Sequence, residues 1–366
     1  MVDRPALTIG IEEEYHLIDP ETRELSSGFA RLVAGEGESV LSPELHQSVV
    51  EIGTEPAANI AEAGRALAAK RRWVANLAAE RGLAIAAAGT HPFSRWQAQA
   101  ITPLQRYQGL VSDLGDVARQ ALTFGMHVHI GVADRELAVD ALNTLRYFLP
   151  HLLALSTSSP FWEGRNTGLK SYRVVAFRRL PRTGIPEQFS SYADFQRYVE
   201  LLMKAGSLED SSKIWWDARV HHRYPTLEFR VCDLCTDLPD ALACAGLFQA
   251  LVYKHYRMRL ANTTFRHYPT SLIEENIWRA SRFGIEGQLI DFGRGEARPA
   301  PEVIAETVAF VDDVLDELGS RPYVEHVYTI LERGTSAERQ LEVFRESGGD
   351  LIAVTDWLIE TTLAGT

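Results

Sequence analysis

TIGIEEEYHL, residues 8–17, is the stretch of sequence that decides the fold of this chain. Because strand side chains point alternately to opposite faces, it predicts a β-strand whose one face carries Gly10, Glu12, Glu14 and His16, while Glu13 joins the apolar face. Adjacent carboxylates repel one another, and acids are uncommon in strands. Glu12 and Glu14 therefore need a positive partner, and a divalent cation such as Mg²⁺ is the simplest one. The alternative is an exposed edge strand whose acids discourage aggregation.

The composition limits the classes of protein to which the chain can belong. Its 366 residues suffice for one large domain or two ordinary ones, and a hydrophobic fraction of 46% suits a globular protein. The net charge of −12 argues against nucleic acid or an anionic membrane surface as a partner. No apolar run approaches the roughly 20 residues of a membrane span, and the N-terminus lacks the segments of a signal peptide.

The cysteines point to the cellular compartment. Cys232, Cys235 and Cys244 are an odd, small number without a secretion signal, which indicates the reducing cytoplasm. Cys232 and Cys235 form a C-x-x-C, but no second pair or nearby histidine completes a zinc site. We interpret this pair as packing at the end of a strand.

Further segments are predicted as strands with one polar face: 46–56, 122–132, 213–220 and 225–233. Such strands are typical of an antiparallel sheet that is open on one side. Two histidines on one strand face favour a metal or phosphate site, although a single histidine is usually packed in a core. The open faces would gather these polar residues: Glu12, Glu14, Glu51, His127, His129, Glu228 and Arg230, with Glu44 at a strand entry.

Acids and histidines gathered on one face repel one another unless cations lie between them. We therefore expect a site for two or more divalent metals, and oxygen ligands with an imidazole suit Mg²⁺ or Mn²⁺. Such ions are commonly shared with nucleotide phosphates. Since the chain contains neither a Walker A sequence nor G-x-G-x-x-G, this sheet face is the expected place for ATP.

The rest of the chain is predicted to be mainly helical, with one long loop. Helical spacing predicts helices at 60–81, 112–120, 134–155, 192–205 and 239–261, and Lys70, Arg71 and Arg72 are expected to face solvent. Residues 262–366 are predicted to be helical, with a glycine-rich break at 292–296. Residues 158–191 are predicted as an irregular loop in which Arg165, Lys170 and Arg173 either bind a carboxylate or phosphate or are merely solvated.

Five motifs in order carry a resemblance. They are Gly10-Ile-Glu-Glu-Glu-Tyr15, Ser42-Pro-Glu-Leu-His-Gln47, Gly125-Met-His-Val-His-Ile-Gly131, Thr167-Gly-Leu-Lys-Ser-Tyr-Arg173 and Pro225-Thr-Leu-Glu-Phe-Arg-Val-Cys-Asp233. Together they resemble the type 2 glutamate–cysteine ligase family of carboxylate–amine ligases, in the glutamine synthetase-like superfamily. The resemblance implies an α+β fold in which a curved, mainly antiparallel six-stranded sheet has helices on its convex face. It also implies a single catalytic domain, 1–366, on which the helical portion 262–366 packs.

The resemblance also implies roles for individual residues. Glu12 and Glu14 would bind two different metal ions, Glu44 and Glu51 would complete one of those sites, and His127 would be a further ligand. His129 would lie close to the nucleotide phosphates. Glu228 would hold the ion that bridges the phosphates, and Arg230 would stabilise the transferred γ-phosphoryl group. Arg165 and Lys170 are candidates for binding the nucleotide, and Arg165 and Arg173 for binding a substrate carboxylate, with Arg173, Glu228 and Arg230 as the catalytic set.

The implied activity is ATP-dependent formation of γ-glutamylcysteine from glutamate and cysteine through γ-glutamyl phosphate. The acceptor amine stays open, because a few contacts decide which side chain fits a small pocket. A metal-dependent hydrolase that activates water with His127 and His129 would contain zinc and need no ATP. A catalytically idle sensor would bind a nucleotide or an amino acid and make no amide. A homodimer is the default expectation for a soluble oligomer.

Overall fold

Strand β1 (Ile9–Ile18) runs through the centre of the molecule in the computed structural model, which describes residues 4–34 and 41–366. In the described residues, the main sheet has seven strands in the order β10-β11-β5-β1-β3-β2, and β4 also pairs with β1. Every pairing in it is antiparallel. The other strands of this sheet are β2 (Ser42–Pro43), β3 (Val49–Gly53), β4 (Ala84–Ala86), β5 (Met126–Gly131), β10 (Ala218–Val220) and β11 (Thr226–Phe229).

The α+β class and the antiparallel sheet are confirmed, but the sheet has seven strands rather than the six expected. The strand that was not expected is the two-residue β2, which pairs with β3, whereas β4 lies in the apolar segment 83–89, which the sequence predicts as a short buried strand. The length of β1 explains how β4 and β5 both pair with it. One edge of β1 pairs with β3 over Glu12–His16, and the opposite edge pairs first with β5 over Ile9–Glu13 and then with β4 over His16–Ile18. A ten-residue strand therefore has room for two partners along a single edge.

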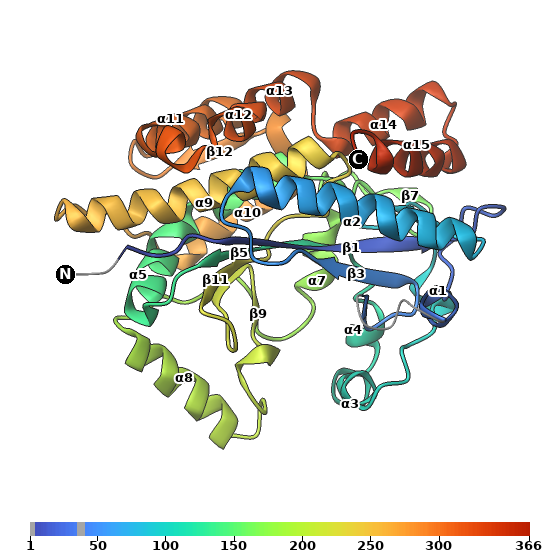
Figure 1. Ribbon diagram of the computed structural model, residues 1–366, viewed down its shortest axis with the longest axis horizontal. Helices are drawn as coiled ribbons and strands as arrows, with labels where there is room; N and C mark the ends of the chain where they lie inside the picture. The colour runs from blue at the N-terminus through green and yellow to red at the C-terminus, as the bar shows by residue number, and fades with distance from the viewer. Residues whose placement is uncertain (1–3, 35–40) are drawn as a thin grey trace.

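Two long helices, α2 (Ile60–Glu80) and α9 (Leu238–Leu260), cover one face of the sheet (Figure 1). Ile9 and Ile11 are fully buried on that side, and the ring of Phe229 stacks on Phe248 of α9 at 4.0 Å between centroids. The helices of the C-terminal part form an outer layer beyond them. In this layer α11 (Ala300–Leu318), α12 (Arg321–Val324) and α13 (His326–Arg333) contact α9, and α15 (Leu351–Leu363) contacts α2 and β4. No helix in the described ranges is both long and apolar enough to span a membrane.

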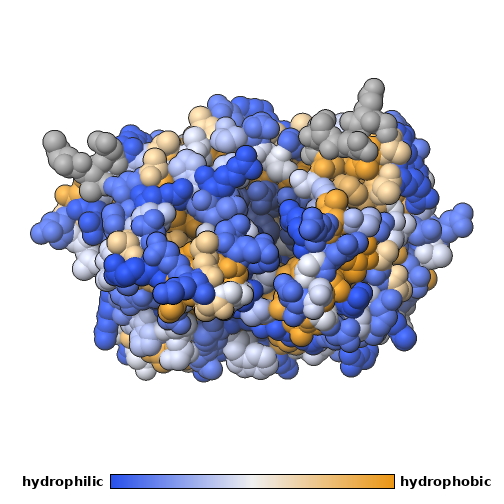
Figure 2. Space-filling model, turned by 90° about the horizontal axis from the view of Figure 1, so that it is seen from below, coloured by the Kyte–Doolittle hydropathy of each residue, from blue (hydrophilic) through white to orange (hydrophobic). Residues whose placement is uncertain are grey.

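The other face of the sheet is not covered in this way. Helices α3, α4 and α8 lie below it at the two ends (Figure 1), and the view from that side shows a hollow between two raised parts (Figure 2). The remaining helices are α1 (Phe29–Val33), α3 (Gln105–Leu114), α4 (Asp116–Arg119), α5 (Arg135–Leu145), α6 (Leu149–Ser156), α7 (Tyr172–Phe177), α8 (Tyr192–Lys204), α10 (Thr270–Phe283) and α14 (Ser336–Glu346).

Several boundaries differ from those expected. The stretch 112–120, expected as one helix, contains the end of α3 and the short helix α4, and the helix expected at 134–155 is interrupted by a 3₁₀ turn at Arg146–Phe148. The loop 158–191 contains helix α7, the hairpin β6 (Phe161–Trp162) with β7 (Arg165–Asn166), and β8 (Thr183–Gly184), which pairs in parallel with β9 (Trp215–Trp216). The glycine-rich break after 291 is the turn of a hairpin between β12 (Gln288–Asp291) and β13 (Glu296–Pro299).

The prediction that Arg71 faces solvent is wrong. The side chain of Arg71 is fully buried between α2 and β1, where it binds both carboxylate oxygens of the equally buried Glu13. It also donates to the carbonyl oxygens of Cys235 and Thr236 at 3.0 and 2.9 Å. Glu13 is therefore neutralised on the helix-covered face, and it takes no part in the acidic cluster on the open face.

Candidate active site

The register of the sheet brings the predicted polar residues together. Glu228 of β11 lies opposite His129 of β5, His127 of β5 lies opposite Glu12 of β1, and Glu14 of β1 lies opposite Glu51 of β3. Since Glu13 points toward α2, the alternation of β1 turns Glu12 and Glu14 to the open face. Residues separated by more than 200 positions in the sequence thus line a single surface.

Glu12, His129 and Glu228 form the first group that could hold a metal ion, because each offers a ligand atom and these atoms all lie within 4.8 Å of one another. Glu12 Oε1 is 3.3 Å from His129 Nε2, and Glu12 Oε2 is 3.2 Å from His127 Nδ1. Burial opposes ionisation of Glu12, but the two histidines outweigh it and hold the pKa of that carboxyl well below its usual range. Glu12 is thus a carboxylate at neutral pH.

Glu14, Glu44 and Glu51 form the second group, with oxygen atoms again within 4.8 Å of one another. Burial and the charge of Glu44 raise the pKa of Glu14 to about 7, and burial together with Glu44 and Glu12 raises the pKa of Glu51 well above its usual value. Three carboxylates at this separation repel one another strongly unless a cation lies between them. The close approach of these three carboxylates therefore fits a site for a divalent metal ion.

His127 lies between the two groups. Its Nδ1 is 3.2 Å from Glu12, its Nε2 is 3.9 Å from Glu14, and burial together with the nearby Arg230 lowers its pKa to about 4. A neutral imidazole is the form that binds a metal. The first group contains His129, for which the family resemblance implied a place near the nucleotide phosphates, while His127 is close to both groups.

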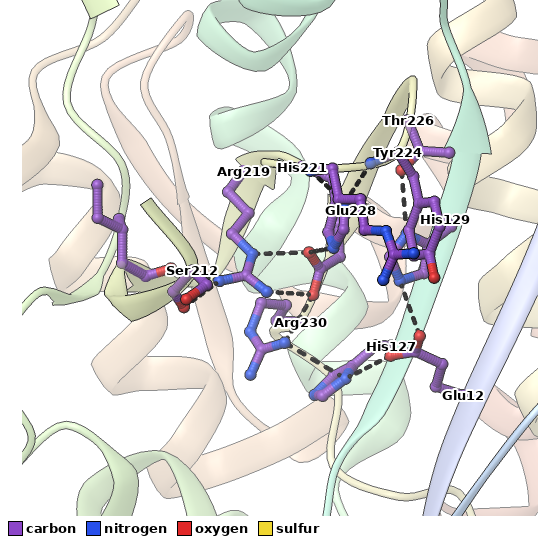
Figure 3. Close-up of polar contacts among 12 residues, drawn as sticks. Glu12, His127, His129, Ser212, Arg219, His221, Tyr224, Thr226, Glu228 and Arg230 are labelled. Atoms are coloured by element: carbon purple, nitrogen blue, oxygen red, sulfur yellow. Dashed lines mark hydrogen bonds and ion pairs between the residues drawn. The ribbon is translucent and has the colours of Figure 1, made fainter. Parts of the chain in front are cut away.

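Glu228 is held by two arginines (Figure 3). Arg219 donates from Nε to Oε2 at 2.6 Å and from Nη2 to Oε1 at 3.1 Å, and Arg230 Nη1 donates to Oε1 at 2.6 Å. The carboxylate is only 1% exposed, so burial works against its ionisation, but Arg219 and Arg230 hold its pKa well below the usual range. Two cationic side chains next to this anion make the region suitable for a further anionic group such as a phosphoryl.

Comparison with known proteins places this site in a family. The profile of the glutamate–cysteine ligase family 2 matches residues 8–356. The chain belongs to this family. A protein of Herpetosiphon aurantiacus, provisionally named glutamate–cysteine ligase 2, is 51% identical over 98% of this chain and 94% of its own length. A protein of Rhodospirillum rubrum with the same provisional name is 48% identical over 98% of this chain and 96% of its own length.

Solved structures share the fold of this family member. The glutamate–cysteine ligase of Francisella tularensis, in complex with AMP, gives a TM-score of 0.73 at 12% identity and covers 100% of this chain and 90% of that chain. A bifunctional glutathione synthetase of Pasteurella multocida gives 0.69 at 16% identity, with 98% of this chain and 52% of that chain covered. At these identities the likeness establishes the ligase fold.

The three cations expected in the loop lie in different places in this glutamate–cysteine ligase family member. Arg173 is buried beside the site and donates to the backbone carbonyl of Arg230 at 3.1 Å. Lys170 instead forms ion pairs with Glu286 and Glu338 at 2.7 and 2.9 Å, toward the C-terminal helices. Arg165 is exposed in the β6–β7 hairpin. The structure does not bring Lys170 or Arg165 to the acidic cluster.

Sequence reasoning missed Arg219, which binds both carboxylate oxygens of Glu228. Strand alternation put it on a polar face with Asp217, but nothing in the order of residues showed that β10 pairs with β11. The register places Arg219 directly opposite Glu228. Thr226, which binds His129 Nδ1 at 3.0 Å, was missed as a site residue because that contact depends on the pairing of β11 with β5.

Proposed function

We propose that this protein is an ATP-dependent carboxylate–amine ligase of the glutamate–cysteine ligase type. The observation that carries the proposal is the convergence of Glu12, Glu14, Glu51 and Glu228 with two histidines and Arg230 on the open face of one sheet. Hydrolysis of a simple substrate does not require so many acids beside an arginine, whereas joining two anionic substrates does.

The chemistry explains why such a site is needed. A carboxylate is a poor acylating agent, because its leaving group would be oxide. Attack of the γ-carboxylate of glutamate on the γ-phosphorus of ATP gives an acyl phosphate and ADP, and the amine of the second substrate then attacks the acyl carbon and expels phosphate. Carboxylate and triphosphate repel one another, so positive charge must be placed between them before they react.

The residues fall into roles in this reaction. One Mg²⁺ or Mn²⁺ would be held by Glu12, His129 and Glu228. A second would be held by Glu14, Glu44 and Glu51, and His127 could be a ligand of either ion. The bound ions would neutralise the phosphate charge. Arg230 would bind the phosphoryl group during transfer, since its buried Nε has no hydrogen-bond partner in the described ranges. Arg173 would support Arg230 through its backbone carbonyl.

The substrates can be tested directly. Purified protein is incubated with Mg-ATP, glutamate and a panel of amines, and ADP and amides are measured by mass spectrometry. We expect equal amounts of ADP and γ-glutamyl amide, with cysteine as the first acceptor to test. Zinc in the purified protein with no use of ATP would indicate the hydrolase, and ATP binding without an amide would indicate the sensor.

Arg230→Ala separates catalysis from folding. The variant keeps Glu228 paired with Arg219, so no carboxylate is left buried and unpaired, and the melting temperature is expected to change little. Loss of the arginine from the phosphoryl group should lower kcat by about 10³-fold or more, as for other transition-state cations. A folded Arg230→Ala variant with full turnover would contradict this role.

The remaining expectations stay predictions. These are a single domain, a homodimer and a cytoplasmic location. The buried, unpaired state of Cys232, Cys235 and Cys244 supports a reducing compartment.

A further inference from the structure

Glu228 has two arginine partners, and the two are bound in different ways. Arg219 makes four hydrogen bonds: two to the carboxylate of Glu228, and two from Nη1 to the backbone carbonyls of Ser212 and Ile214 at 3.0 and 2.7 Å. Its side chain lies buried between the sheet and the segment Ser211–Lys213 (Figure 3). Arg219 is therefore fixed at both ends of its guanidinium group.

Arg230 is held much less firmly. It makes one charged hydrogen bond, from Nη1 to Glu228 Oε1, and its Nη1 is 3.4 Å from His127 Nδ1. His127 Nδ1 also lies 3.2 Å from Glu12 Oε2. In a neutral imidazole this nitrogen can either donate to Glu12 or accept from Arg230, but it cannot do both. The buried Nε of Arg230 has no partner in the part of the chain that the structure describes. Moving Arg230 away from Glu228 therefore breaks one charged hydrogen bond, whereas moving Arg219 breaks four hydrogen bonds.

We propose that Arg219 is a positioning residue, which fixes the carboxylate of Glu228 toward Glu12 and His129 and so leaves Arg230 free to bind the phosphoryl group. The inference rests on the proposed ligase function for the part that concerns Arg230. It assigns the two arginines different tasks: Arg219 sets the geometry of the first metal group, and Arg230 interacts with the substrate. A buried carboxylate with only one movable partner would turn away from its neighbours whenever that partner moved.

Arg219→Lys tests the proposal, because lysine keeps the charge but cannot form the two parallel bonds. Mn²⁺ is titrated into the protein without ATP, and free Mn²⁺ is followed by electron paramagnetic resonance. We expect the affinity of the group formed by Glu12, His129 and Glu228 to fall about 10- to 100-fold, as it does when residues that orient metal ligands are changed, while the second group keeps its affinity. The kcat for amide formation should fall by a similar factor, while KM for glutamate stays unchanged.

Two further variants separate positioning from general loosening. Arg182→Gln removes a hydrogen bond from Arg182 Nε to the carbonyl of Lys213 at 2.9 Å, in the same segment but away from Glu228, and should leave Mn²⁺ affinity unchanged. Arg230→Lys should also keep Mn²⁺ affinity while lowering kcat, because Arg219 still holds Glu228. This comparison is informative even where Arg219→Lys does not fold.

The proposal is overturned if Arg219→Lys binds Mn²⁺ as tightly as the unaltered protein, if Arg182→Gln weakens binding equally, or if Arg230→Lys weakens it to the extent predicted for Arg219→Lys. Failure of the ligase function gives a different result. In that case the unaltered protein makes no amide, but the Mn²⁺ affinities still separate Arg219→Lys from the two other variants, and the positioning of Glu228 by Arg219 stands.

Discussion

The carboxylates on the open face of the sheet cannot all be ionised at neutral pH unless a cation lies between them. Glu14, Glu44 and Glu51 are close enough to share one ion, and their pKa values are raised by burial and, for Glu14 and Glu51, by the neighbouring acids. Stability is therefore given up at these residues in favour of the site, which is common where a functional cluster is built. The cost should be measurable.

Glu51→Gln should stabilise the protein at neutral pH in the presence of a chelator, because the raised pKa means that Glu51 must take up a proton on folding, whereas glutamine is neutral in both states. We expect a gain of at least about 1 kcal/mol in the free energy of unfolding, because each pKa unit corresponds to about 1.4 kcal/mol. With Mg²⁺ the order should reverse, since the unaltered protein gains a ligand that the variant lacks. Thermal melting with EDTA and with Mg²⁺ gives both values. The exposed Glu21→Gln serves as the control, and a Glu51→Gln variant less stable in EDTA would contradict the prediction.

The sequence predicts a residue well when its role depends only on which face of a strand it occupies, and poorly when its role depends on which strands pair. Glu12, Glu14, His127, His129 and Glu228 were placed on one face correctly, because the two-residue period of a strand fixes the face of every side chain. Arg219 could not be found in this way, because its partner is set by the pairing of β10 with β11. Lys170 lay in a basic motif, but its charge is used to bind Glu286 and Glu338.

At the scale of elements, helix α2 is attached to strand β1 through a buried ion pair. The helical spacing of Leu67, Arg71, Val74 and Ala78 places all four side chains on one stripe, and all four are fully buried. The charge of Arg71 suggested a solvent-exposed position, but its spacing indicated the core. The spacing was the better guide, because a buried arginine is tolerated when a carboxylate and backbone carbonyls satisfy its donors.

Arg71→Leu should destabilise the protein strongly, since it leaves the carboxylate of Glu13 buried without a cation, and among the described residues only the Tyr15 hydroxyl still donates to it. Breaking a buried pair in this way costs about 3–5 kcal/mol. The double variant Glu13→Leu, Arg71→Leu should recover much of that loss, because two apolar side chains of suitable size can replace a buried ion pair. Urea denaturation of the single and double variants measures the difference. Equal stability of Arg71→Leu and the unaltered protein would contradict a structural role for the pair.

The loop that carries Lys170 is attached to the C-terminal helices. Besides its two ion pairs, the backbone N–H groups of Lys170 and Ser171 donate to the carbonyl of Ser281 in α10 at 2.8 and 3.0 Å. Lys170→Met should therefore lower the free energy of unfolding by about 1 kcal/mol, a typical value for a partly exposed pair. KM for ATP should not change, with Lys204→Met, at an exposed position of α8, as the matched control. A tenfold rise in KM for ATP at unchanged stability would instead return Lys170 to the nucleotide site.

At the scale of the whole molecule, α9 joins the sheet to the C-terminal helices. This helix is buried on nearly every side: Phe248 stacks on the sheet residue Phe229, while Gly246 lies against Val324 of α12. A helix that is apolar all round needs neighbours on all sides. One hydrophobic cluster accordingly extends from Leu7 to Ile330. The sequence predicted the helices of this layer, but not the hairpin of β12 and β13, which has too few residues to show a period.

If these layers form one domain, residues 1–366 should unfold in a single cooperative step, with circular dichroism and tryptophan fluorescence giving the same transition in urea. A chain that ends at residue 261 would expose the outer side of α9 and should not fold, whereas removal of residues 364–366, which lie beyond α15, should have little effect. Two separate transitions, or a folded fragment 1–261 that binds Mn²⁺, would contradict the single domain. The acidic face depends on α2 and α9 behind the sheet, and α9 in turn depends on the C-terminal helices, so metal binding should be lost together with the fold in the same step.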